Sequence, residues 1–153
     1  MTISVQSIKK CLFFVLAMCS TTFVNAQYGK TPAIVIDSFA AKYTNATAIV
    51  WKDNNYSFQA TFKMGDSEMK STFSSKGKWL REETKMIYNS LPAEVKEGFN
   101  RSKYAAIPIR DIAKLEERGK PLQYRITVMK GTLNKTSLVF SNTGQLMSDK
   151  NFL

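Results

Sequence analysis

The sequence contains no histidine and only two cysteines, Cys11 and Cys19, among its 153 residues. Without histidine the chain lacks the commonest general base, any serine–histidine triad and any histidine-ligated metal site. Both cysteines lie in an N-terminal segment that we expect to be cleaved. The mature chain then has no cysteine for a disulfide, a thiolate metal site or a nucleophile. We therefore expect a domain whose stability depends on its hydrophobic core.

Residues 1–26 have the pattern of a secretory signal peptide. Two lysines precede a short apolar run from Cys11 to Cys19, and Ala26 occupies the −1 position of a cleavage site. This run is too short to span a bilayer comfortably, so we expect no stable membrane insertion. A lipoprotein signal that ends at Cys19 is the alternative, although the preceding methionine is a poor match to such signals. We expect an exported protein, either periplasmic or secreted.

The chain from Gln27 onward is long enough for one domain and is strongly basic. Without Lys9 and Lys10, 20 basic residues stand against 12 acidic ones, which is a net charge of +8. Two explanations fit this excess: general solubility, or attraction to an acidic partner. The basic residues are dispersed rather than gathered into a stripe, which argues against nucleic-acid binding.

No motif for catalysis or cofactor binding stands out. The adjacent carboxylates Glu82–Glu83 and Glu116–Glu117 would point to opposite faces of a strand. The segment Asp53–Asn55 is typical of a turn and lacks the alternating ligands of a calcium loop. A glycine-rich phosphate loop is absent, and no serine–lysine pair stands in a convincing context. The sequence therefore predicts no enzyme, no cofactor and no metal site.

One apolar pattern occurs twice, at Pro32–Phe39 and at Pro92–Phe99. Each copy starts an amphipathic helix, with Thr31 as the expected N-cap of the first and Pro32 at its first helical position. Strand-like segments follow each helix. The expected strands are Ala46–Lys52, Tyr56–Lys63, Glu68–Ser75, Lys78–Glu83, Ala105–Ala113, Leu122–Met129, Lys135–Phe140 and Gln145–Asp149.

These segments predict an α+β fold of two tandem units, each a helix followed by four strands, over about 31–84 and 91–150. Such units rarely bury an apolar face alone, so we expect one antiparallel sheet with both helices on one face. The second unit is longer than the first, and its extra residues fall in Lys114–Pro121.

Core and turn residues recur in a recognisable order along the whole mature chain. They are Pro32, Val35, Phe39, Val50, Trp51, Tyr56, Ala60, Phe62, Phe73, Gly77, Trp79, Leu91, Pro92 and Val95. This order resembles the PepSY-like periplasmic proteins of Bacteroidetes, which are also described as beta-lactamase-inhibitor-like. The resemblance implies a single domain over 27–153, with helices on one sheet face and an open, often concave, face opposite. In the inhibitors that this family resembles, the open face grips another protein. No catalytic motif carries over, and inhibition does not follow from the fold.

Strand alternation predicts which side chains occupy the open face. If Tyr56, Phe58, Ala60 and Phe62 face the helices, the intervening polar residues face away from them. The same rule applies to the later strands. Trp51 and Trp79 are harder to place, because a neighbouring apolar residue must point the opposite way in each case. The candidate binding residues are Gln59, Thr61, Lys63, Lys70, Thr72, Arg125, Thr127, Met129, Trp51 and Trp79.

These features predict a non-enzymatic binding module whose polar, basic open face engages a protein or peptide of the cell envelope, with an acidic partner as one option. The alternative is a sensor that binds an amphiphile or polyanion between the two halves. An apolar pocket between the halves would favour the sensor, and an open saddle would favour the protein partner.

Overall fold

The computed structural model describes residues 31–152, so the predicted signal peptide and both cysteines lie outside the described residues. Within these residues two α-helices, α2 (Ala33–Lys42) and α3 (Ala93–Asn100), each precede four strands. The first four strands are β1 (Thr47–Asp53), β2 (Ser57–Met64), β3 (Ser67–Ser74) and β4 (Trp79–Lys85). A short 3₁₀ helix, η1 (Tyr88–Ser90), leads into α3, and the last strands are β5 (Ile109–Glu117), β6 (Gln123–Lys130), β7 (Asn134–Ser141) and β8 (Leu146–Phe152).

A proline stands immediately before each helix, so α2 begins at Ala33, one residue later than we expected. Pro32 is the N-cap of α2 with an extended backbone (φ −60°, ψ 143°), and Pro92 takes the same place before α3 (φ −55°, ψ 150°). The prediction of Thr31 as the N-cap is therefore wrong. Neither cap makes a side-chain hydrogen bond. The fixed φ of proline suits this extended position as well as the first helical one.

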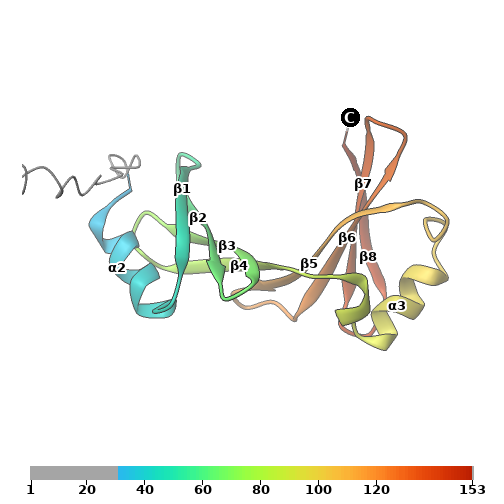
Figure 1. The fold of residues 1–153 in the computed structure, drawn as a ribbon, viewed down its shortest axis with the longest axis horizontal. Helices are drawn as coiled ribbons and strands as arrows, with labels where there is room; N and C mark the ends of the chain where they lie inside the picture. The colour runs from blue at the N-terminus through green and yellow to red at the C-terminus, as the bar shows by residue number, and fades with distance from the viewer. Residues whose placement is uncertain (1–30, 153) are drawn as a thin grey trace, which may run out of the picture.

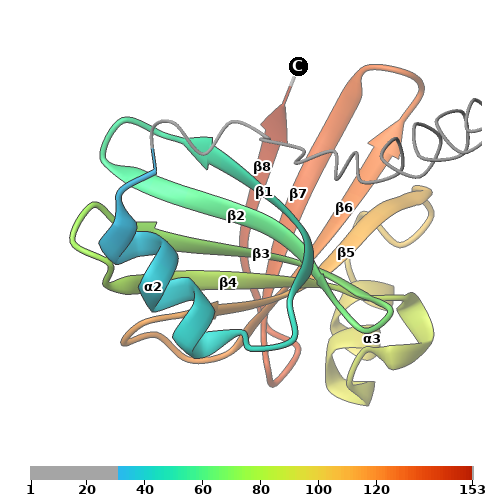
Figure 2. The ribbon, with the colours of Figure 1, turned by 60° about the vertical axis from the view of Figure 1, so that its left-hand side comes forward.

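The eight strands form one antiparallel sheet in the order β1 to β8, which confirms the predicted fold class. Its register places both helices on the same face. Phe62, beneath α2, pairs with Met69, and the same row continues through Thr84 and Lys114 to Tyr124 beneath α3. Figures 1 and 2 show the two helices against different ends of this curved sheet.

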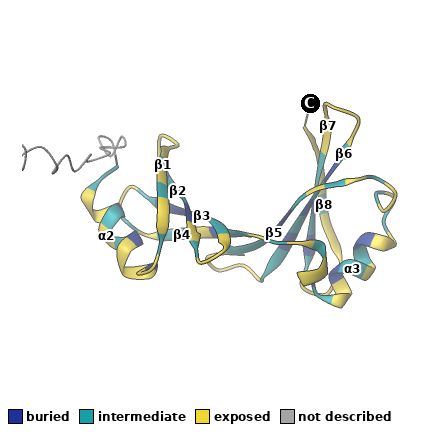
Figure 3. Ribbon diagram, in the orientation of Figure 1, coloured by how far each residue is buried: buried dark blue, intermediate teal, exposed yellow. Residues whose placement is uncertain are grey.

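Each helix covers its own hydrophobic core. Beneath α2 the core gathers Val35, Phe39, Tyr43, Phe58, Ala60, Phe62 and Phe73. The α3 core contains Leu91, Val95, Phe99, Ile112, Tyr124, Ile126, Val128, Leu138 and Phe140. The buried positions alternate along β2 and β6, as the strand patterns predict (Figure 3). Two helices are therefore needed to bury one face of the single sheet.

A polar contact closes the α2 core toward the middle of the sheet. The Tyr43 hydroxyl donates to the Glu82 carboxylate and lies 2.9 Å from Ser71 Oγ. Glu82 is only 8% exposed, so this partner replaces much of its lost hydration. Burial and, secondly, the hydrogen bond to Glu82 raise the pKa of the Tyr43 phenol above its ordinary value. Tyr43 thereby holds the end of α2 against β3 and β4.

Two local expectations are wrong. Tyr56 does not face the helices, because it lies in the turn before β2 and is 88% exposed. The first strand of the second half also begins later than expected: β5 spans Ile109–Glu117 rather than Ala105–Ala113. Its last residues, which belong to the extra length of the second unit, pair with β4 and continue the ladder.

Candidate binding face

The sheet face opposite α2 and α3, here called the open face, carries no helix among the described residues. Figure 1 shows β1–β2 and β6–β8 rising on the two sides of the middle strands, with α2 and α3 outside them. The open face therefore lines the inside of the curve. Such a concave surface can contact the side of another macromolecule more extensively than a flat surface can.

Eight of the ten predicted residues lie on the open face. Gln59 pairs with Thr72, and Thr61 pairs with Lys70. Thr72 is only 5% exposed, and Arg81 Nε lies 3.5 Å from its hydroxyl oxygen. The remaining members on this face, by the same alternation, are Lys63, Arg125, Thr127 and Met129.

Trp51 and Trp79 lie on the other face. The Trp51 ring packs edge-on against Phe39 with a centroid separation of 5.3 Å, because Trp51 pairs with buried Ala60. Trp79 packs against the same core, and Lys42 Nζ lies 4.8 Å from the centroid of its ring. Neither tryptophan therefore belongs to the open-face set. In β1 it is Val50, the neighbour of Trp51, that faces the open side, and it is 66% exposed.

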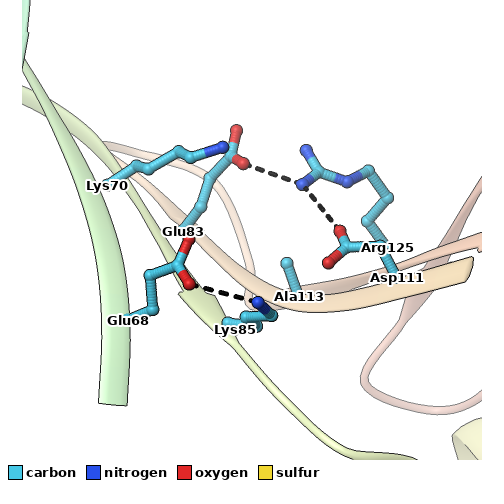
Figure 4. Close-up of a pocket in the computed structure, with 7 residues that line it drawn as sticks. All are labelled: Glu68, Lys70, Glu83, Lys85, Asp111, Ala113 and Arg125. Carbon is cyan, nitrogen blue, oxygen red and sulfur yellow. Dashed lines mark hydrogen bonds and ion pairs between the residues drawn. The ribbon is translucent and has the colours of Figure 1, made fainter. Parts of the chain in front are cut away.

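The centre of the open face is a cluster of paired charges where the two halves meet (Figure 4). Arg125 Nη2 on β6 lies 2.8 Å from Glu83 Oε2 on β4 and 3.6 Å from Asp111 Oδ2 on β5. Small Ala113 lies between them in the sheet, which leaves room for the arginine to cross β5. Arg125 is thus an internal clamp between the halves as well as a surface residue.

A second pair completes this central cluster. Lys85 Nζ contacts Glu68 Oε2 at 3.1 Å, and Lys70 lies beside Glu83 on the neighbouring strand. The cluster holds three cations and three carboxylates, so the middle of the open face is neutral rather than basic. Sequence reasoning missed its acidic members, Glu68, Glu83 and Asp111. Strict alternation through β4 would have placed Glu83 beside the predicted Lys70.

Replacing Arg125 with methionine is expected to lower the free energy of unfolding by about 1–3 kcal/mol. The change leaves two carboxylates, Glu83 and Asp111, facing each other without their shared cation. Arg110→Met is the matched control, because Arg110 is exposed on β5 and makes no ion pair with a described residue. Urea denaturation measures both variants. Equal stability of the two would contradict the clamp.

The cavities near the junction of the two halves are either small or open to solvent. The one over the central charges holds only about 30 Å³. A wider groove of about 740 Å³ lies beside the β2–β3 turn and the connector after β4. Its apolar lining comes from Met86 and Ile87, while charged residues such as Lys63, Asp66 and Lys114 surround them. Within residues 31–152 there is therefore no enclosed apolar pocket between the two halves.

No group of three or more acidic residues among residues 31–152 is arranged to hold a metal ion. None of the described helices is long and apolar enough to cross a membrane.

Comparisons with known proteins agree with this geometry. The family described as "Putative beta-lactamase-inhibitor-like, PepSY-like" matches residues 56–148. A BLIP-like protein from Bacteroides fragilis is 29% identical, with a TM-score of 0.73 over 82% of this chain and 89% of its own. A "putative periplasmic" protein from Bacteroides eggerthii shares the fold at 20% identity, with a TM-score of 0.76 over 80% of this chain and 90% of its own. No curated protein sequence matches. The chain belongs to the PepSY-like, beta-lactamase-inhibitor-like family.

Proposed function

We propose that this protein is an exported, non-enzymatic binding module whose open face engages a protein or peptide of the cell envelope. The observation that carries the proposal is the concave sheet face, which no helix of residues 31–152 covers. The description of the Bacteroides eggerthii protein supports export, and that of the Bacteroides fragilis protein supports a protein partner. The absence of histidine throughout the chain supports a role without catalysis.

A protein partner fits the open face better than a small molecule does. Small-ligand sites are commonly apolar pockets of about 300–1,000 Å³ that enclose most of the ligand. The hollow between the halves holds about 30 Å³ and is lined by charges. The wider groove beside Met86 and Ile87 is the place where the alternative, an amphiphile sensor, would find apolar contacts. We favour the protein partner because the open face extends across all eight strands, whereas this groove lies beside one turn and one connector.

Charge strengthens the case for a partner with acidic character. Several basic residues of the open face make no ion pair with any described residue. Unpaired surface charges steer association and favour a partner of opposite sign. Outside the neutral centre, these residues are Lys52, Lys63, Arg81, Lys135 and Lys150.

The variant Lys52→Glu, Lys63→Glu tests the open face. Pull-down from an envelope extract is expected to recover at least about tenfold less of the partner than the wild type does, because two unpaired cations become repulsive. Lys42→Glu, Lys96→Glu is the matched control, since it makes the same charge change on α2 and α3. Urea midpoints establish that all the proteins are folded.

The pattern of recovery decides the proposal. Loss with the open-face variant alone supports it, and unchanged recovery with both variants argues against it. If the control loses the same proteins, overall charge is responsible rather than this face. A direct assay against secreted proteases and beta-lactamases then tests whether binding inhibits an enzyme.

A further inference from the structure

A groove at one end of the open face gathers three cations that contact no carboxylate within the described part of the chain. This basic groove is defined by Lys78, Arg81 and Arg118, with Ser57, Thr72 and Glu117 beside them, and its volume is about 380 Å³. None of its three cations makes an ion pair with a described residue. In contrast with the neutral centre of the open face, this end carries an uncompensated positive charge.

Part of this groove comes from Lys114–Pro121, the stretch by which the second half of the chain is longer than the first. The first residues of the stretch Lys114–Pro121 extend β5 as far as Glu117, which pairs with Arg81 of β4. The Arg118 amide then donates to the Leu80 carbonyl oxygen at 2.9 Å, which holds the two arginines at the same end of the sheet. Figure 2 shows the turn between β5 and β6 lying alongside β4. The extra length therefore brings a second-half arginine beside a first-half arginine.

The donors in the basic groove are largely unused. Arg81 Nε lies 3.5 Å from Thr72 Oγ1, a long contact that leaves the other guanidinium donors free. Glu117, the single carboxylate of the lining, contacts Lys120 Nζ at 2.9 Å. The three cations therefore outnumber the available negative charge. Two arginine forks and two hydroxyls suit planar carboxylates, which accept paired N–H···O bonds.

We propose that the basic groove receives acidic side chains of the partner, and so recognises a segment rich in glutamate or aspartate. This inference rests on the proposed function, because it assigns part of the open face to the same partner. Leu80 is the only large apolar side chain in the lining, so a lipid chain has almost nothing to pack against. The inward curve of the sheet suits a protruding protein segment better than a flat membrane surface.

Fluorescence anisotropy with a labelled hexaglutamate peptide tests the groove on the mature protein. Arg81→Gln, Arg118→Gln is expected to weaken binding at low salt by at least about tenfold, because charge-assisted hydrogen bonds are lost. Lys135→Gln, Lys150→Gln removes two charges elsewhere on the open face and is expected to change affinity less than about twofold. Urea midpoints within error of the wild type show that each variant is folded.

Three results would overturn the inference. The first is equal weakening by both variants, which indicates only a response to net charge. The second is unchanged binding by the Arg81, Arg118 variant. The third is displacement of the peptide by inorganic phosphate at an equal concentration, which indicates a small-anion site instead.

The pull-down distinguishes this inference from the proposed function. If the Lys52, Lys63 variant loses the partner and the Arg81, Arg118 variant retains it, the open face binds but the basic groove does not. If both variants retain every protein, both proposals fail. Loss with both variants, together with the peptide result, supports both.

Discussion

Gly98→Ala is expected to lower the free energy of unfolding by about 2–3 kcal/mol, although alanine is normally the better helix former. A Cβ on Gly98 would lie 2.0 Å from the carbonyl oxygen of Gly144, in the turn between β7 and β8. Backbone lies on both sides of this contact, so no flexible side chain can give way. Helix α3 would have to move off the sheet.

The matched control is Gly65→Ala. A Cβ on Gly65 meets nothing within 4 Å, and its φ of +57° costs about 1–2 kcal/mol through backbone strain alone. Urea denaturation measures the free energy of unfolding of both variants. It thereby compares the cost of a steric clash at Gly98 with the cost of backbone strain alone at Gly65. Stabilisation by Gly98→Ala, which an ordinary exposed helix position would give, would contradict the packing of α3 on this turn.

Phe39→Ala is expected to destabilise the protein by about 3–5 kcal/mol. Phe39 is 3% exposed, and its ring lies 4.9 Å from Phe62, 5.0 Å from Tyr43 and 5.3 Å from Trp51, measured between centroids. Removing the ring leaves a cavity between α2 and the sheet, and aromatic neighbours on three sides cannot all collapse into it.

Ile34→Ala on the same helix provides the comparison. Ile34 is 54% exposed, so its truncation is expected to cost less than about 1 kcal/mol. Thermal or urea unfolding measures both variants. Similar losses for the two would mean that α2 is not anchored through Phe39.

Local patterns were sufficient for most of the fold. Alternation in Phe58, Ala60 and Phe62 predicted the buried side of β2, and the paired Pro-to-Phe segments predicted both helices. These predictions succeed because buried side chains recur about every 2 residues in a strand and about every 3.6 residues in a helix. The bounds of β5 were harder to place. Its first residues pair with β6 and its last residues pair with β4, and neither contact is visible in the local pattern.

In the candidate site, too, local patterns predicted some features, and others depend on contacts between distant strands. Alternation placed Lys63 and Lys70 on the open face, but it could not show that Arg125 is engaged by Glu83 and Asp111. Those contacts join three strands from both halves of the chain. Whether a charged residue is paired or free depends on side chains that only the assembled sheet brings together. The distinction decides which cations are available to a partner.

The sequence by itself determined that the chain lacks histidine and that no cysteine follows the predicted signal peptide. It also determined the order of helices and strands, since hydrophobic periodicity is a local property. Only the tertiary structure decided that the centre of the open face is neutral and that one end is basic. The pairing of β4 with β5 places Arg81 beside Arg118, and the crossing of Arg125 over Ala113 neutralises the centre. Electrostatic energy depends on distances through space, which follow from strand register rather than from sequence separation.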